Sequence, residues 1–203
     1  MKILKILLTS VLVVGFIIPG CNSDLGCDCS SVKKFFDIQG ITSSFEYQNG
    51  TISDTYQWQD LVGKIIYDTE YYGDLNLDNE KPLYGFSLIP TASACSCPPD
   101  GWSGSEEGLD SVIITTIHDY NATYPAGSEI NAITEYYTFE TGDYEVYEDF
   151  ASRNTQAVFE QLHIYKLTQA PATTGTPFQL NIRLLLDNGE EYNVTTQEVT
   201  LNL

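Results

Sequence analysis

Apolar and polar residues alternate along several short stretches of this chain, and a period of two is typical of β-strands with one buried face. The clearest stretch covers residues 178–186, where every second residue is apolar: Phe178, Leu180, Ile182, Leu184 and Leu186. The turn sequence Asp-Asn-Gly-Glu follows at 187–190, and a return strand is predicted over 191–201. The apolar parity of the return strand changes near Thr196, which predicts a bulge or a crossing between two sheets.

The other predicted strands are rich in β-branched and aromatic residues and are separated by turn residues. They cover residues 38–47, 56–67, 83–89, 110–118 and 162–165. Asn49-Gly50 supplies a turn between the first two. Helix is scarce: Ser128 is a candidate N-cap for one short helix, and a second helical turn is expected near 148–153. The pattern predicts an all-β fold, an antiparallel immunoglobulin-like β-sandwich with one or two short helices.

The first twenty residues follow a different pattern. Lys2 and Lys5 are followed by an apolar stretch over 6–18 and then by Pro19 and Gly20. This order is typical of a secretory signal peptide, and the stretch is too short to span a bilayer as a helix.

The sequence Ile18-Pro19-Gly20-Cys21 resembles the lipobox of bacterial lipoproteins, with Pro19 where that motif usually has a small residue. The resemblance implies that the chain is cut before Cys21 and that lipid attached to Cys21 holds it on a membrane. We therefore expect a signal peptide at 1–20, a tether at 21–31 and a single β-sandwich domain at 32–203.

The chain is strongly acidic. Its formal net charge is −19, and removal of residues 1–20 takes away two lysines and no acid, which makes the charge −21. A surface this negative repels nucleic acid and anionic lipid head groups, so neither is expected as a partner.

Four cysteines remain beside Cys21, in two C-x-C pairs: Cys27 with Cys29, and Cys95 with Cys97. In an exported chain they indicate two disulfides. Disulfides between the two pairs are expected, because a disulfide within one C-x-C is strained. Two connectivities stay open: Cys27–Cys97 with Cys29–Cys95, and Cys27–Cys95 with Cys29–Cys97. The first link would stabilise the fold by about 4 kcal/mol. A zinc site is the rival, but C-x-C is tighter than the usual ligand spacing.

Several motifs together resemble uncharacterised outer-membrane lipoproteins of the Bacteroidota. They are the lipobox, the early cysteines, a Cys-Pro loop with Gly-Ser-Glu before a strand, the stretch Ala126-Gly127-Ser128-Glu129-Ile130-Asn131 and the final Asp-Asn-Gly hairpin. This resemblance implies an immunoglobulin-like sandwich anchored to the outer membrane, on its periplasmic face or at the cell surface. It supplies no catalytic residue.

The sequence offers little support for catalysis or for a cofactor. The stretch 101–105 looks like a nucleophile elbow but lacks its last glycine, and no zinc-binding H-E-x-x-H motif is present. His118 and His163 lie in strand-like stretches and are expected to be structural. The oxygens of 74–80 resemble half a calcium loop, without its glycine and its bidentate acid, so calcium binding there stays open.

Two features bear on function. The 28 acidic residues could supply a glycosidase pair. Six aromatic residues also alternate with acids over 135–150; they could pack inward, stack on sugars or anchor a protein interface: Tyr136, Tyr137, Phe139, Tyr144, Tyr147 and Phe150. We expect a lipid-anchored, non-enzymatic envelope protein that binds a protein or glycan through sandwich loops. The alternatives are a carboxylate-based glycoside hydrolase and a structural adhesin or pilus-like subunit.

Overall fold

A computed structural model describes residues 31–74 and 97–203. The chain divides into two units, of which the second comprises Lys33–Asp74 and Pro99–Leu203. The first comprises Met1–Val32 and Leu75–Pro98, and only residues 31, 32, 97 and 98 of it are described. The expected signal peptide, the expected strand at 83–89 and the calcium-like stretch after Asp74 lie outside the described residues. All the strands of the described residues belong to the second unit.

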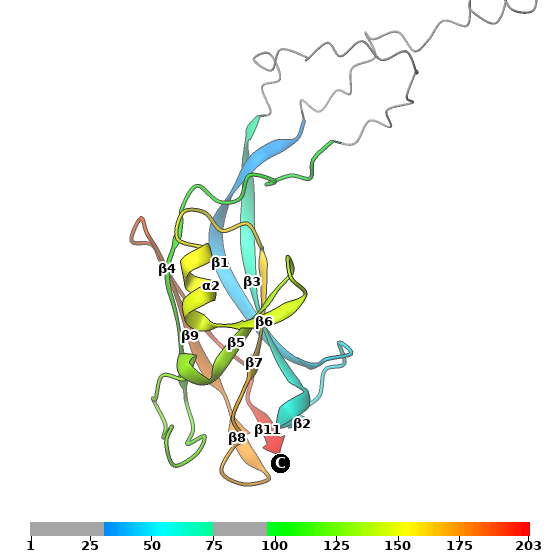
Figure 1. Ribbon diagram of the computed structural model, residues 1–203, viewed down its shortest axis with the longest axis vertical. Coiled ribbons are helices and arrows are strands. Elements are labelled where there is room, and N and C mark those ends of the chain that lie inside the picture. The colour runs from blue at the N-terminus through cyan, green and yellow to red at the C-terminus, as the bar shows by residue number, and fades with distance from the viewer. Residues whose placement is uncertain (1–30, 75–96) are drawn as a thin grey trace, which may run out of the picture. The chain divides into compact units, whose positions relative to one another are not determined.

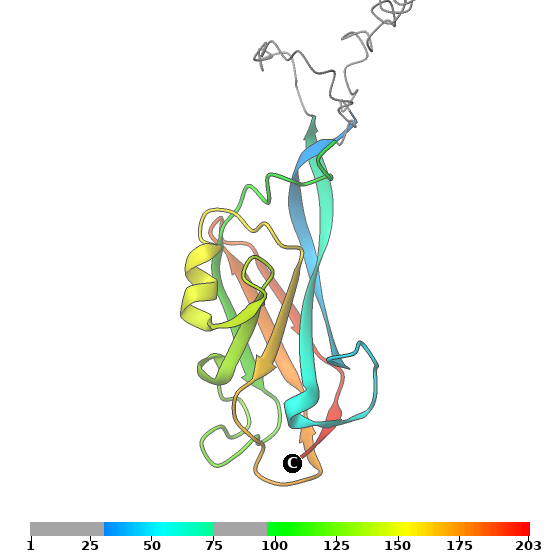
Figure 2. The same ribbon diagram turned by 45° about the vertical axis from the view of Figure 1, so that its right-hand side comes forward.

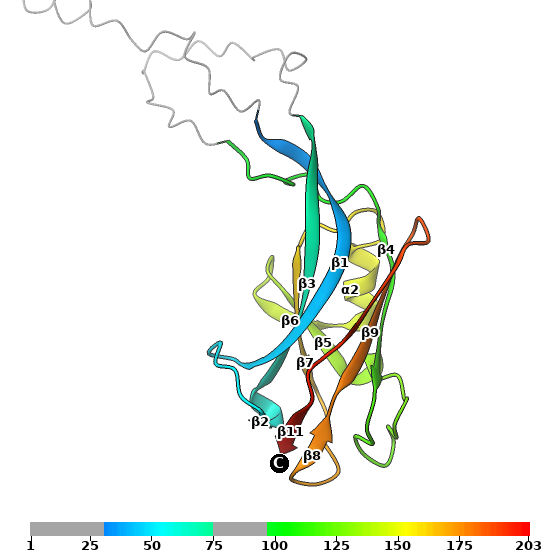
Figure 3. The same ribbon diagram turned by 180° about the vertical axis from the view of Figure 1, so that it is seen from behind.

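Three sheets make up this unit (Figure 1, Figure 3). The five-stranded sheet has the order β1 (Lys33–Tyr47), β3 (Leu61–Asp74), β7 (Leu162–Leu167), β5 (Thr134–Thr138) and β6 (Asp143–Val146). A three-stranded sheet contains β10 (Glu191–Thr195), β9 (Leu180–Leu186) and β4 (Leu109–Thr116). Another contains β2 (Thr55–Gln57), β11 (Val199–Asn202) and β8 (Thr176–Phe178).

Helical segments are short. They are η1 (Trp58–Asp60), η3 (Asn131–Ile133) and α2 (Tyr147–Arg153). All strand pairs are antiparallel except β2 with β11. The predicted all-β fold, an antiparallel sandwich with one short α-helix, is confirmed for the described part of the chain.

The core follows from the alternation of the strands. Apolar side chains at every second position of β9 and β4 are buried against the inward side chains of β1 and β3, such as Phe36, Ile38 and Ile65. The inward residues of all three sheets belong to one apolar cluster. Burial of that cluster is the main source of folding free energy, at about 25 cal/mol per Å² of apolar surface.

The C-terminal hairpin changes sheet halfway along, as the parity change near Thr196 predicted. β9 pairs with β10, whereas β8 pairs with β11 in another sheet. At the crossing, the Leu180 amide donates to the Thr196 hydroxyl at 3.0 Å, and the Thr196 amide donates to the Leu180 carbonyl at 2.9 Å. The Gln179 side-chain amide donates to the Thr196 carbonyl at 2.9 Å. These bonds satisfy backbone groups where the regular ladder is interrupted.

Two local predictions were wrong. Residues 56–67 do not form one strand, because η1 interrupts them and β2 pairs with β11 rather than with β1. The Asn49-Gly50 turn forms, with the Gly50 amide donating to the Tyr47 carbonyl at 2.8 Å, but it leads to β2. Ser128 caps no helix: η3 is one short turn that begins after Ile130, and residue 134 is already in β5.

Candidate functional site

The aromatic residues of 136–150 divide between the two faces of the five-stranded sheet. Tyr136 is fully buried and stacks on Phe150 of α2, with ring centroids 4.0 Å apart. Tyr137 is the next residue of β5, so its ring lies on the outer face, opposite Tyr144 of β6. Phe139 follows β5 and is half exposed. The inward packing that the sequence allowed is therefore correct for part of the set only.

The outer face of the five-stranded sheet carries apolar side chains on its inner strands. Outward positions of β3 are occupied by Val62, Lys64 and Ile66, and those of β7 by Leu162, Ile164 and Lys166. Ile66 is 41% exposed, which is unusual for a branched apolar side chain at the middle of a sheet. A groove of about 460 Å³ crosses this face; its lining includes Val62, Lys64, Tyr137, Tyr144, Ile164 and Lys166.

Two ion pairs lie among these apolar side chains. Lys64 pairs with Glu46 of β1. Lys166 Nζ lies 3.2 Å from a Glu135 carboxylate oxygen and 3.9 Å from the centre of the Tyr144 ring. The outer face thus mixes apolar side chains with paired charges, a composition that protein–protein interfaces also have.

The outer rings do not form a flat platform. Tyr137 and Phe139 are perpendicular, at 90° with centroids 5.1 Å apart. Tyr137 and Tyr144 meet at 67° with centroids 5.4 Å apart. A row of coplanar rings, which would suit stacking on sugars, is absent among these three side chains.

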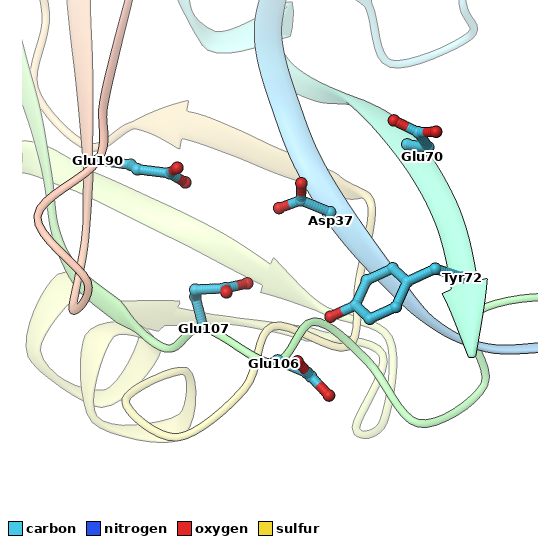
Figure 4. A pocket seen from close by; sticks show the side chains of 6 residues that line it. All are labelled: Asp37, Glu70, Tyr72, Glu106, Glu107 and Glu190. Atoms are coloured by element: carbon cyan, nitrogen blue, oxygen red, sulfur yellow. The ribbon is translucent and has the colours of Figure 1, made fainter.

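A second hollow, of about 430 Å³, is acidic. It is lined by Asp37, Glu70, Tyr72, Glu106, Glu107 and Glu190. Figure 4 shows the carboxylates of Asp37, Glu107 and Glu190 pointing toward one shared space from β1, from the segment before β4 and from the β9–β10 turn. No local sequence pattern could reveal this acidic pocket, because its residues are up to about 150 positions apart along the chain.

Glu107 is the most perturbed of these acids. Burial raises the pKa of its carboxyl, and the neighbouring Asp37, Glu190 and Glu106 raise it further, against a lowering by a backbone hydrogen bond. Its Oε2 atom is buried and has no hydrogen-bond partner among the described residues. Burial also raises the pKa of Tyr72, whose hydroxyl bonds to Glu106. A carboxyl whose pKa is raised in a concave site has the property that a general acid needs.

Neither histidine lies in the groove or in the acidic pocket. His163 is buried between the rings of Tyr67 and Phe150, at centroid distances of 5.1 and 4.8 Å. Burial, with Arg153 nearby, lowers its pKa to about 3, so it is neutral. His118 Nε2 lies 2.7 Å from a Glu198 carboxylate oxygen.

The stretch 101–105, which only superficially resembles a nucleophile elbow, has a structural role. The Ser105 hydroxyl accepts a bond from the Val158 amide at 2.8 Å and donates to the Glu107 carbonyl. Among the described residues, no group of three acidic, histidine or cysteine side chains could hold a metal ion, and no helix is long and apolar enough to cross a membrane. Of the expected lipidation and disulfide residues, only Cys97 is described; Cys21, Cys27, Cys29 and Cys95 lie outside.

Comparisons with known proteins provide little further information. No family model and no curated protein matches the chain. One similar solved structure is the C-terminal domain of the Streptococcus pyogenes antigen I/II-family protein AspA, at 12% identity and a TM-score of 0.23. The match covers 81% of this chain and 46% of that one. At this TM-score the likeness supports no argument about function.

Proposed function

We propose that this is a lipid-anchored, non-enzymatic protein of the bacterial outer membrane that binds a protein partner. The observation behind the proposal is the outer face of the five-stranded sheet, where Ile66 and Ile164 lie beside the ion pairs of Lys64 and Lys166. Exposed apolar side chains set among polar ones on one face are typical of interaction sites. The binding surface is thus a sheet face, rather than the loops that the sequence favoured.

A protein partner fits this face better than a glycan. The rings of Tyr137, Phe139 and Tyr144 meet edge to face, so no flat surface is offered to a sugar ring. The aliphatic side chains of β3 and β7 supply contact area without hydrogen bonds. Tyrosine at the border of such a patch is typical of interface anchors.

The lipid anchor rests on the lipobox-like Ile18-Pro19-Gly20-Cys21 and on the signal-peptide pattern before it. Export also explains the four further cysteines, which we propose form two disulfides. Strand exchange in the manner of a pilus subunit is disfavoured, because the C-terminal β11 lies between β2 and β8. Its removal would leave two strands unpaired.

Site-specific photo-crosslinking in the native envelope tests the binding face. A photoreactive phenylalanine analogue replaces Tyr137 in one variant and Phe159 in the other. Phe159 is exposed and lies outside the groove, so it is a matched control. We expect a discrete protein adduct from position 137 alone, and its loss when Ile164→Lys is added. Adducts of equal yield at both positions, or a glycan adduct at 137, would contradict the proposal.

The acidic pocket supports a second candidate, glycoside hydrolysis. Three carboxylates point into one concave space, and the raised pKa of Glu107 suits a general acid. In this role Glu107 would protonate the leaving oxygen while Asp37 or Glu190 acted from the opposite side. Release of reducing sugar from envelope polysaccharides, abolished by Glu107→Gln and retained in Glu148→Gln, would establish it; absence of release by the wild-type protein would remove it.

A further inference from the structure

The end of the β1–β3 ribbon brings lysine and aromatic side chains together. Lys33 pairs with Asp74 and Phe35 with Tyr72, and beyond the other strands these two strands continue as a twisted ribbon (Figure 2). Side chains from both faces of this end, together with Trp102, form what we call the ribbon-end patch: Lys33, Lys34, Phe35, Tyr71, Tyr72 and Trp102. Two consecutive lysines are notable in a chain with only nine basic residues.

A loop fixes Trp102 to this patch. The Gly101 amide donates to the Lys33 carbonyl at 2.8 Å, and the Ser103 amide donates to the Lys34 carbonyl at 3.0 Å. Gly101 has a φ of 73°, and a Cβ there would lie 2.9 Å from ring atoms of Phe36 and Tyr71. The close approach holds the backbone of Trp102 against the ribbon.

Two of the four aromatic side chains of the patch are exposed. Trp102 is 46% exposed and Tyr71 is 38% exposed. Lys34 Nζ lies 4.8 Å from the centre of the Phe35 ring, so its alkyl chain follows the apolar surface while the charge stays outside. Tryptophan, tyrosine and snorkelling lysine are the side chains that favour the boundary between lipid and water.

The chain joins this end to the proposed lipid site. Eleven residues separate Cys21 from Lys33. Fully extended, they reach at most about 40 Å, so the ribbon end stays near the membrane that holds the acyl chains. The only other tryptophan of the sequence is Trp58, in η1. η1 directly precedes the start of β3, whereas the ribbon end lies at the finish of that 14-residue strand. That strand separates the two tryptophans by roughly 40 Å.

We propose that the ribbon-end patch rests on the zwitterionic headgroup layer of the membrane that holds the lipid on Cys21, with Trp102 and Tyr71 inserted at the boundary. The inference depends on the lipid anchor of the proposed function. Anionic lipid is not the ligand, because Tyr72 also borders the acidic pocket and the whole chain is strongly negative. The contact orients the molecule so that the binding face of the five-stranded sheet stands clear of the bilayer.

Tryptophan fluorescence tests this orientation with one built-in control. The full-length acylated protein is reconstituted into phosphatidylcholine vesicles that contain brominated phosphatidylcholine. The variant Trp58→Phe keeps Trp102 as its single tryptophan, and the variant Trp102→Phe keeps Trp58. We expect Trp102 to be quenched about twofold or more relative to Trp58, whose emission should not change. Both variants must show the wild-type thermal transition, so that misfolding is not mistaken for a result.

The outcomes separate the patch from the anchor. Protein that floats with the vesicles but shows equal quenching of the two tryptophans overturns the patch and leaves the anchor intact. Protein that does not float with the vesicles overturns both. Quenching of Trp102 that appears only with anionic phosphatidylglycerol overturns the zwitterionic assignment.

Discussion

Gly63 and Tyr165 face each other across β3 and β7, and the Tyr165 ring lies where a side chain at position 63 would be. A Cβ on Gly63 would be 2.1 Å from Cζ of Tyr165. Tyr165 is fully buried and cannot swing into solvent. The glycine therefore makes room for the ring inside the core, and the ring covers the strand backbone that the glycine leaves bare.

Replacement of Gly63 by alanine should destabilise the fold. The methyl group would force Tyr165 from its position in a packed core, and such overpacking costs about 1–3 kcal/mol. Chemical denaturation of Gly63→Ala measures the loss. Gly40→Ala is the matched control, because a Cβ there meets only Asp68 Cβ, at 3.9 Å. Equal stability of the two variants would show that the ring has room to move.

The sequence could predict features that depend on local periodicity. The parity change around Thr196 predicted the sheet crossing, because each strand there has one buried face and a change of face must appear in the pattern. The break in 56–67 was missed, because β2 is fixed by its parallel pairing with β11, far along the chain.

The candidate sites were harder to predict from sequence. That Tyr136 points inward and Tyr137 outward follows from strand alternation, but the register of β5 had first to be known. One signal for the outer face was present: Leu162 and Ile164 are apolar on the outward parity of a strand whose inward residues include His163 and Tyr165. No sequence signal indicated the acidic pocket, because only the fold brings Asp37, Glu107 and Glu190 together.

Acid should destabilise the protein partly through His163. The pKa of His163 in the folded state is about 3, below the ordinary 6.5. Below pH 6.5 the unfolded chain therefore binds a proton at this histidine that the native state does not bind. This contribution is fully present above pH 6.5 and is lost as the pH falls toward 3, at up to about 1.4 kcal/mol per pH unit. Denaturant titrations from pH 7 to 4 should show a smaller decline in the free energy of unfolding for His163→Phe. His118→Gln, at an exposed ion pair, should follow the wild type.

Glu107 should act on stability in the opposite pH direction. Its folded-state pKa is raised above the ordinary value, so the native state holds a proton that the unfolded chain releases as the pH rises. Its favourable contribution exists at low pH and is lost on the way to neutrality. Glu107→Gln should therefore be more stable than the wild type at pH 7, with the difference disappearing near pH 4. Glu148→Gln, on an exposed turn of α2, should show no such difference.

Oxidised thiols are expected in the exported protein. Denatured, unreduced mature protein should react with no thiol reagent at Cys27, Cys29, Cys95 or Cys97, since the two C-x-C pairs are expected to bridge each other. Peptide mapping then distinguishes the two connectivities. Four reactive thiols in protein isolated from the envelope would rule out the disulfides, and zinc released on denaturation would identify the rival metal site.

Asn131 should be essential to the outer edge of β4. The backbone of Ser128 and Ile130 bonds to this edge at Thr116 and Ile114. The Asn131 side chain continues the pairing: its Oδ1 accepts the Ile114 amide at 3.0 Å, and its Nδ2 donates to the Val112 carbonyl at 2.6 Å. Asn131→Ala leaves a buried donor and a buried acceptor unpaired, which costs about 2–4 kcal/mol in total. Asn193→Ala, which removes an exposed amide bonded to Glu191, is the control and should change the free energy of unfolding little.

Because the loss of the Asn131 side chain exposes one strand edge, hydrogen exchange at the Ile114 amide should accelerate more in Asn131→Ala than exchange in β9, which is paired on both sides. Uniform acceleration across both strands would show that Asn131 supports the fold as a whole rather than this edge.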